Sequence, residues 1–166
     1  MESCCFTGHR RIPAEDLTFL TERLDECLYR LIDEGIYRFR AGGAMGFDRL
    51  AAERVLEMRR RFDFVHLDLI LPCHGQTRGW PTEEAVAYRR IMAEADRVVF
   101  LQEQYSDGCM QRRNLQLLAG SSVCVCYQTH AGGGTAFTVT HAKRQGLRVI
   151  NLARISQNEP DPITLF

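Results

Sequence analysis

Three joints in this chain share one pattern, in which a helical periodicity ends at a glycine and a β-branched or aromatic run begins at once. The glycines are Gly35, Gly120 and Gly146, and the runs that follow them are IYRFR, SSVCVCY and LRVINL. Glycine closes helices readily because, without a Cβ, it adopts the left-handed conformation at little cost. Helix-to-strand joints this short favour alternating helices and strands, and therefore a mainly parallel sheet.

The same alternation extends over most of the chain. The first predicted helix carries leucines at spacings of three and four, which form an apolar stripe that can pack on a sheet: Leu17, Leu20, Leu24, Leu28 and Leu31. Further helices are predicted near residues 47–61, 82–95, 109–119 and 134–145, and strands near residues 2–6, 36–41, 65–71, 97–101, 122–127 and 147–152. We therefore predict a Rossmann-like three-layer α/β/α fold with a mainly parallel sheet of about six strands. It forms a single domain over residues 1–152, followed by an irregular tail over residues 153–166.

Composition narrows the classes of partner. Lys and Arg number 21 and so do Asp and Glu, so no strong net field attracts polyanions, which ranks nucleic acid below a small molecule. No apolar run reaches the ~18 residues of a membrane span, and the N-terminus lacks a signal-peptide pattern. The seven cysteines, an odd number without CxxC spacing, predict neither a disulfide framework nor a metal site. We expect a cytoplasmic protein with no metal and no membrane partner; the cofactor and the formation of a homo-oligomer stay open.

The loops after the predicted strands differ in chemistry from the loops after the helices. Helices are followed by little more than one glycine, whereas polar or glycine-rich segments follow the strands at residues 7–10, 41–48, 72–76, 105–108 and 129–135. Right-handed crossovers bring the carboxyl ends of parallel strands to one edge, where open α/β sheets bind ligands. The asymmetry predicts a ligand site at that edge.

The segment 41–48 is the first glycine-rich candidate for an anion site. Gly42, Gly43 and Gly46 lie between a strand and a helix, where backbone amides can approach a phosphate with no side chain in the way. The segment approximates a dinucleotide fingerprint, but no acidic residue ends the next strand, which disfavours hydride transfer with NAD. A turn needed only for close packing is the alternative interpretation. Asp48 is a candidate either for binding a ribose hydroxyl or for capping the helix.

A second glycine-rich turn opens the last predicted helix, with Gly132, Gly133, Gly134 and Thr135. The free amides and the positive end of a helix favour an anion, and the Thr135 hydroxyl can donate to it. Thr135 is equally a candidate for a simple helix cap. Two such turns at one edge predict an anion site more strongly than either does alone.

Side chains in the neighbouring loops complete the predicted site. Arginine pairs with phosphate bidentately, asparagine reads a base edge or a ribose, and the rings of Trp80 and Tyr105 either stack on a base or pack under a loop. Catalytic residues are left unassigned. The predicted ligand-binding residues are Thr7, Gly8, His9, Arg10, Gly42, Gly43, Gly46, Asp48, Gln76, Trp80, Arg113, Asn114, Gly132, Gly133, Gly134 and Thr135.

Several motifs follow one another from about Cys4 to Leu152, namely TGHR, AGGAMGFDRLAAERVL, LPCHGQ, ADRVV and GGGT. In this order they closely resemble the YpsA-like family of the SLOG superfamily, which also contains the DNA-processing protein DprA and the lonely-guy phosphoribohydrolases. The resemblance implies a Rossmann-like fold and a pocket for a nucleotide or a nucleotide-derived molecule, including ligands related to NAD or ADP-ribose.

The resemblance leaves the reaction open. The phosphoribohydrolases carry a PGGxGTxxE motif with a catalytic glutamate, and alignment on Gly134 and Thr135 puts Thr138 at the position of that glutamate. This departure disfavours N-glycosidic hydrolysis of that type, unless Asp48 or Glu53 takes over the role.

We therefore predict that the chain binds a nucleotide or nucleotide-derived ligand at the glycine-rich edge, as a sensor or regulatory protein. The alternative is a hydrolase, similar to the phosphoribohydrolases, that cleaves an N-glycosidic or phosphate bond of such a ligand. Binding of single-stranded nucleic acid is the third option, because residues 41–56 resemble the glycine turn and helix of DprA.

Overall fold

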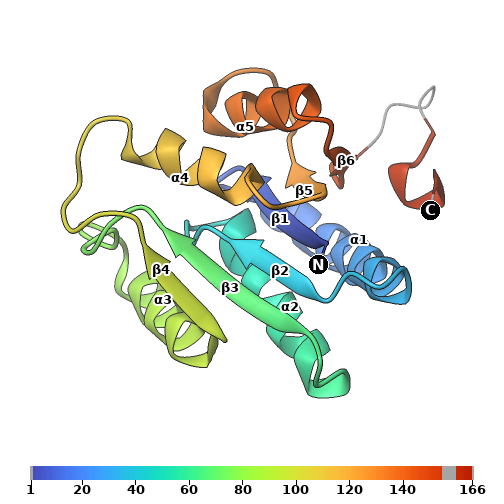
Figure 1. The fold of residues 1–166 in the computed structure, drawn as a ribbon, viewed down its shortest axis with the longest axis horizontal. Coiled ribbons are helices and arrows are strands. Elements are labelled where there is room, and N and C mark those ends of the chain that lie inside the picture. The colour runs from blue at the N-terminus through green and yellow to red at the C-terminus, as the bar shows by residue number, and fades with distance from the viewer. Residues whose placement is uncertain (1, 155–159, 166) are drawn as a thin grey trace.

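The computed structural model describes residues 2–154 and 160–165 of the chain. Six strands form one sheet in which every described pairing is parallel, in the order β4-β3-β2-β1-β5-β6 (Figure 1). The predicted Rossmann-like fold is confirmed. The strands are β1 (Ser3–Gly8), β2 (Arg38–Ala41), β3 (His66–Leu71), β4 (Arg97–Phe100), β5 (Val123–Tyr127) and β6 (Arg148–Asn151).

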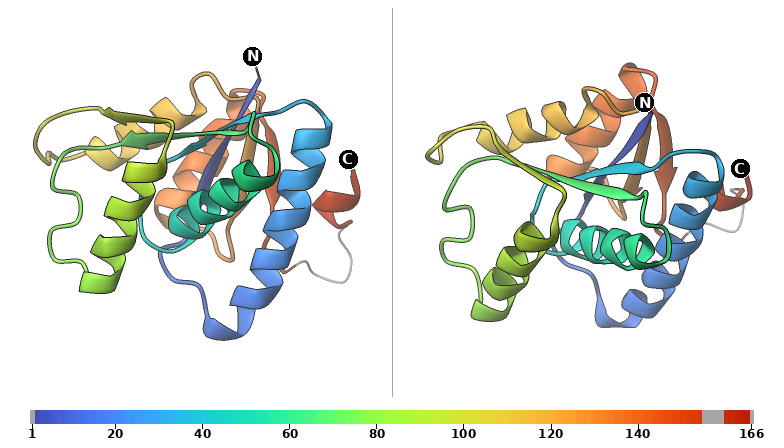
Figure 2. Two further views of the ribbon diagram at one scale, coloured as in Figure 1. Left: turned by 90° about the horizontal axis from the view of Figure 1, so that it is seen from below. Right: turned by 60° about the horizontal axis from the view of Figure 1, so that its bottom comes forward.

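Five helices connect these strands and cover both faces of the sheet. Figure 2 shows α1, α2 and α3 on one side of the sheet and α4 and α5 on the other, which completes the three layers. Each connection returns to a parallel strand, so that the sheet is buried between the helical layers. The helices are α1 (Ala14–Asp33), α2 (Phe47–Arg61), α3 (Thr82–Glu94), α4 (Cys109–Leu118) and α5 (Gly133–Arg144).

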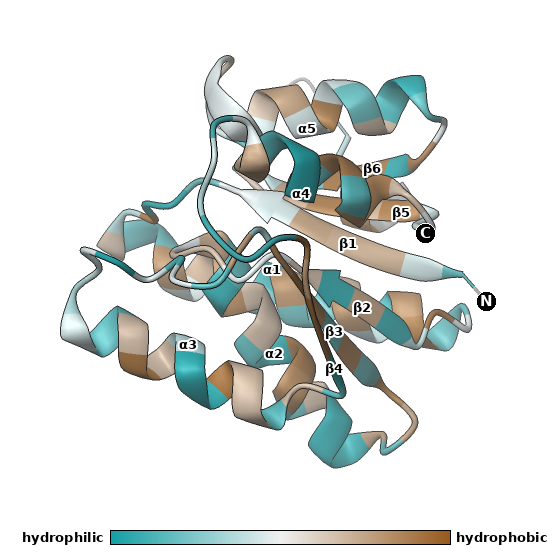
Figure 3. Ribbon diagram, turned by 60° about the vertical axis from the view of Figure 1, so that its left-hand side comes forward, coloured by the Kyte–Doolittle hydropathy of each residue, from teal (hydrophilic) through white to brown (hydrophobic). Residues whose placement is uncertain are grey.

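The predicted leucine stripe of α1 is buried except at its first member. Leu20, Leu24, Leu28 and Leu31 are fully buried, whereas Leu17 is 46% exposed. Leu17 lies in the first turn of α1, beyond the edge of the sheet, where it lines a cavity instead of the core. Figure 3 shows the hydrophobic residues gathered along the strands and the helix faces that turn toward them.

The order of the strands reverses beside β1. From β1 the chain builds β2, β3 and β4 toward one side of the sheet, and then crosses to build β5 and β6 on the other. The reversal falls between β1 and β5, which pair in parallel from Cys4 and Val123 to Gly8 and Tyr127. Open α/β sheets form their binding crevice at such a point, between the loops that follow the two strands.

The predicted irregular tail includes a short 3-10 helix, η1 (Pro162–Leu165), that packs against α1 and β6. Ile163 is buried, and the Arg23 guanidinium donates to both carboxylate oxygens of Asp161 at 2.7 and 2.8 Å. Residues 155–159 of the tail lie outside the described residues. In the part of the chain that the structure describes, no helix has the length and apolarity needed to span a bilayer.

Candidate functional site

A cavity of about 910 Å³ lies at the carboxyl-terminal edge of the sheet, where the strand order reverses. We call it the crossover cavity. It is bordered by the loop after β1, the first turns of α1, α2 and α3, and the loop after β5. The residues that line it are His9, Arg10, Arg11, Ile12, Pro13, Asp16, Leu17, Gly46, Arg49, Leu50, Glu53, Glu83, Glu84, Tyr127, Thr129 and His130.

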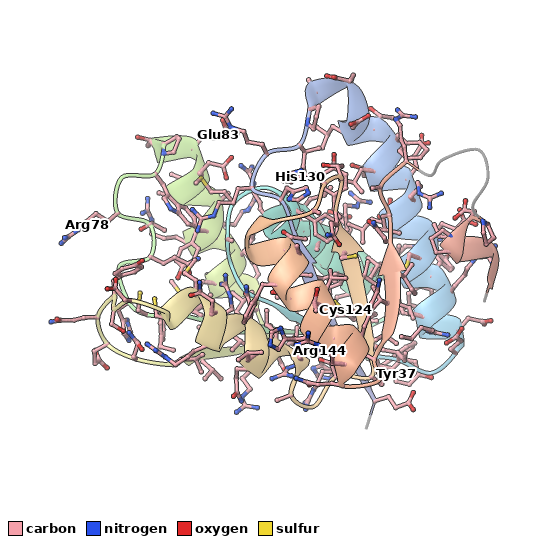
Figure 4. The ribbon with its side chains drawn as sticks, turned by 90° about the horizontal axis from the view of Figure 1, so that it is seen from above. Tyr37, Arg78, Glu83, Cys124, His130 and Arg144 are labelled. Carbon is pink, nitrogen blue, oxygen red and sulfur yellow. The ribbon has the colours of Figure 1, made fainter. Side chains whose placement is uncertain are left out.

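Two histidines stack in the crossover cavity, one from each side of the reversal. The rings of His9 and His130 are 4.1 Å apart and nearly parallel, with 4° between their planes. The Thr129 amide donates to His9 Nε2 at 2.9 Å, so neutral His9 carries its proton on Nδ1. Burial and the nearby His130 lower the pKa of His9 from 6.5. Figure 4 shows His130 at the same edge as Glu83, with Tyr37 at the opposite edge.

The arginines of this cavity differ in their pairing. Arg49 is neutralised by Glu53 at 2.6 Å and by Glu84 at 3.1 Å. Arg10 and Arg11 are exposed, and neither has a carboxylate within 4.0 Å among the residues that the structure describes. The cavity therefore holds two guanidinium groups that an anionic ligand can pair with.

The glycine-rich turn between β2 and α2 is closed by packing. The Ala44 amide donates to Asp48 Oδ2 at 3.2 Å, and the Phe47 amide donates to the carbonyl of His9 at 3.1 Å. A Cβ at Gly46 would overlap the backbone carbonyl of Arg10. The packing interpretation thus accounts for Gly46, and two amides of this turn are already bonded.

Asp48 and Arg113 support this closed turn from the interior of the protein. Both are buried, and Arg113 Nη1 donates to the carbonyl of Gly42. Burial raises the pKa of the Asp48 carboxyl, and the Arg113 charge opposes that shift. The cap of α2 is Gly46, so Asp48 is not the cap, and it does not line the crossover cavity.

The turn between β5 and α5 is open. Gly132 and Gly133 have φ of 102° and 78°, and a Cβ at either would meet nothing within 4 Å. The helix begins after Gly132 with no side-chain cap, so the alternative of capping by Thr135 is not observed. Because the first amides of a helix have no partner within it, this turn presents donors to an incoming anion.

Two neighbouring side chains of α4 reach the two glycine-rich turns: Arg113 bonds to the turn before α2, and Asn114 lies beside the turn before α5. Arg113 Nε donates to Asn114 Oδ1 at 2.8 Å, and Asn114 Nδ2 lies 4.0 Å from the position of a Cβ on Gly134. The two predicted turns therefore lie at the same edge, one on each side of α4. Gly132, Gly133 and Gly134 do not line the crossover cavity itself.

A second cavity, of about 850 Å³, adjoins the same edge and includes three of the predicted residues, Arg10, Gln76 and Trp80. We call it the aromatic cavity. Trp80 packs edge-on against Tyr88, with ring centroids 5.6 Å apart. The residues that line it are Arg10, Cys73, His74, Gly75, Gln76, Arg78, Trp80, Glu103, Gln104, Tyr105 and Met110.

Five of the predicted residues are buried, namely Thr7, Gly42, Asp48, Arg113 and Thr135. Thr7 is buried within β1, and a Cβ on Gly8 would lie 2.5 Å from the Phe47 side chain. Conversely, the prediction missed Arg11 and Tyr127, which line the crossover cavity. Arg11 follows directly on the TGHR motif, so its place in the loop was a usable signal; the Tyr127 ring gave none, because it ends an apolar strand.

The two carboxylates considered as replacements for a catalytic glutamate are both engaged. Asp48 is bonded to the Ala44 amide, and Glu53 lines the crossover cavity but pairs with Arg49. Thr138 is buried and donates to the carbonyl of Gly134 at 2.9 Å. Among residues 2–154 and 160–165, no group of three His, Cys, Asp or Glu side chains is placed to hold a metal ion.

Fold and edge together define an open, parallel α/β protein with a cavity at its crossover point. The model of the YpsA family, described as the YspA SLOG family, matches residues 5–156, so the chain belongs to this family. A similar protein is the uncharacterised SPbeta prophage-derived protein YoqJ of Bacillus subtilis, which is 24% identical over 74% of this chain and 81% of its own length. A UPF0398 protein of Staphylococcus epidermidis is 30% identical over an aligned stretch that covers 50% of this chain and 44% of that protein.

A similar solved structure is that of DNA processing protein A from Helicobacter pylori, a protein with a single-stranded DNA binding mode. It aligns with 99% of this chain and 70% of its own, with a TM-score of 0.66 and 18% identity. At that identity the likeness shows a shared fold.

Proposed function

We propose that this protein binds a phosphate-bearing nucleotide or nucleotide-derived molecule in the crossover cavity, as a sensor or regulatory protein. Molecules related to NAD or ADP-ribose are the favoured class. The observation that carries the proposal is a pair of guanidinium groups, those of Arg10 and Arg11, which have no carboxylate partner among the described residues and line a cavity of about 910 Å³ at the strand-order reversal.

Charge and hydrogen bonding in the cavity suit such a ligand. Arg10 and Arg11 supply forked donors for phosphate, and the Nδ1 proton of neutral His9 supplies another. The open amides after Gly132 lie beyond His130 and suit a second anionic group. A cavity of this size lies within the range of small-molecule sites, roughly 300–1,000 Å³.

Calorimetric titration with AMP, ADP, ADP-ribose and NAD tests the proposal. We expect saturable binding that Arg10→Gln and Arg11→Gln each weaken by about tenfold or more, the loss of one charge-assisted contact. Arg89→Gln is the matched control, because Arg89 is exposed on α3 outside both cavities. Failure of all four ligands to bind, or an equal loss with the control variant, contradicts the proposal.

Hydrolysis of the ligand is a second candidate, favoured by the acidic side chains that line the same cavity. Asp16, Glu53 and Glu84 lie there, and each is ion-paired: Asp16 with Arg154, and Glu53 and Glu84 with Arg49. A carboxylate serves as general acid or base when it reaches the scissile bond. Mass spectrometry of each bound ligand after incubation separates the two functions: release of a base or a ribose phosphate supports hydrolysis, and an unchanged ligand supports binding alone.

Single-stranded nucleic acid is the third candidate, since DNA processing protein A from Helicobacter pylori, which has the same fold, has a single-stranded DNA binding mode. Phosphate contacts displace counterions, so affinity for a strand must fall as salt rises. Titration of an oligodeoxyadenylate at low and at high salt tests it, and binding that ignores salt contradicts it.

A further inference from the structure

The crossover cavity and the aromatic cavity share one side chain, Arg10. Arg10 lines both the cavity of about 910 Å³ and the cavity of about 850 Å³, and its guanidinium makes no ion pair with a described carboxylate. A guanidinium group presents donors along more than one side, so a single phosphate at Arg10 can carry substituents into both cavities.

The walls of the two cavities differ in chemistry. The crossover cavity is rich in charge, with Arg11, Arg49 and Glu84 among its lining residues. The aromatic cavity has Trp80 and Tyr105, and Tyr105 is 68% exposed. A tyrosine ring this exposed has a free face, on which a nucleobase can stack without displacing any other side chain.

The amide of Gln76 is the second feature that points to a base. Its Nε2 and Oε1 atoms are shielded from solvent, and neither has a hydrogen-bond partner among the described residues. Shielded polar groups in folded proteins nearly always have partners, so an unpaired amide beside a cavity calls for an explanation. A glutamine amide offers a donor next to an acceptor, which matches the edge of adenine.

The loop that carries Gln76 is uncrowded at the glycines on either side of that residue. Gly75 and Gly79 flank it with φ of 73° and 79°, and a Cβ at either would meet nothing within 4 Å. The backbone on both sides of Gln76 is therefore uncrowded, and binding of a base requires the shielded Gln76 amide to turn toward the aromatic cavity.

We infer that the aromatic cavity is a nucleobase subsite, and that the complete ligand consists of two nucleoside units joined through phosphate. The phosphate lies at Arg10, one unit occupies the crossover cavity, and the base of the other stacks on Tyr105 and Trp80 within reach of Gln76. The second subsite deepens the proposed function and rests on it. Two sources supply this chemistry, a free dinucleotide or a step of a single strand.

The test compares ligands of one and two units on the full chain. AMP is the one-unit probe; the two-unit probes are diadenosine diphosphate, adenylyl-3′,5′-adenosine and an oligodeoxyadenylate. We expect the preferred two-unit probe to bind at least about fivefold tighter than AMP, because a stacked base adds its own interaction. Tightest binding of diadenosine diphosphate identifies a free dinucleotide, and tightest binding of the oligonucleotide identifies a strand.

Variants locate the added affinity. Tyr105→Ser and Trp80→Leu are expected to lower two-unit affinity by about fivefold or more while leaving AMP affinity unchanged. Phe64→Ser is the matched control, because Phe64 is 45% exposed and contacts the ring of Tyr37, at the opposite edge of the molecule. Tyr105→Ser removes an exposed ring, so it tests the subsite even where Trp80→Leu unfolds the loop.

The outcomes separate this inference from the proposed function. The second subsite is overturned if AMP and every two-unit probe bind with equal affinity and Tyr105→Ser changes none of these affinities. The crossover cavity then remains as the proposed site. An equal loss of AMP and two-unit affinity in Tyr105→Ser also overturns the second subsite. Absence of binding by every probe to the wild-type chain overturns both.

Discussion

The turn between β2 and α2 and the turn between β5 and α5 look alike in sequence and differ in structure. Both place several glycines between a strand and a helix at the same edge of the sheet. In the first turn a Cβ on Gly46 would overlap backbone, whereas in the second a Cβ on Gly133 would meet nothing within 4 Å. The first turn is filled by the protein's own atoms, and the second is left for solvent or a ligand.

Glycines therefore serve two separate physical needs in these turns. In the first turn they let the chain pass close to the loop after β1 and to α4, which sets the wall of the crossover cavity. In the second they keep side chains away from the free amides of α5. Only the second need resembles phosphate binding, so the geometry at Gly132 and Gly133 suits an anion better than the geometry at Gly42 and Gly43 does.

Replacement of one glycine in each turn is expected to give the largest difference in stability between the two turns. Gly46→Ala is expected to lower the free energy of unfolding by about 3–5 kcal/mol, because the new methyl meets backbone that cannot yield. Gly133→Ala should cost only about 1–2 kcal/mol, from the left-handed backbone alone. Urea denaturation measures both, and equal losses would break the distinction between a closed and an open turn.

Removal of the arginine below the closed turn should have the next largest effect. Arg113→Met removes the hydrogen-bond donor to the Gly42 carbonyl and the positive charge beside buried Asp48. We expect this variant to lower the free energy of unfolding by about 2–3 kcal/mol. Arg112→Met is the matched control, because Arg112 is exposed and bonded to exposed partners such as Ser106. It should change stability by less than about 0.5 kcal/mol. A loss of that small size in Arg113→Met would show that the turn closes without it.

The smallest expected effect is on the loop that leads into the open turn. His9 holds this loop in place, because its Nε2 accepts a hydrogen bond from the Thr129 amide. The pKa of His9 is lowered from 6.5, so neutral His9 is the form that the fold favours. Its contribution is present above pH 6.5 and is lost as the pH falls through the lowered pKa, when Nε2 gains a proton and can no longer accept. NMR titration should show the Thr129 amide shifting together with the His9 ring.

A neighbouring variant sharpens that titration. His130→Ala should raise the His9 midpoint, because the positive charge that disfavours a second imidazolium is gone. His66→Ala serves as the control, since His66 is exposed on β3 and begins that strand at its opposite end. A His9 midpoint at or above 6.5 in the wild-type chain would refute the assignment.

Local patterns were enough to predict the order of elements and the edge at which the polar and glycine-rich loops gather. The leucine spacing of α1, the glycine after each helix and the polar loops after strands all depend on residues close in sequence, so they can be read without the fold. Leu17 shows the limit: its spacing fits the stripe, but the helix extends past the sheet and leaves it exposed.

Local sequence patterns predict the alternating strands and helices, the parallel sheet and the gathering of glycines and cations at one edge. Which glycine turn is closed depends on the tertiary structure, since the atoms that fill the closed turn come from Arg10 and Arg113, distant in sequence. The tertiary structure also brings His9 against His130 and places Arg10 in the lining of two cavities. The physical reason is that propensity and periodicity act over a few residues, whereas closure of a turn and the shape of a cavity depend on side chains that meet across the sheet.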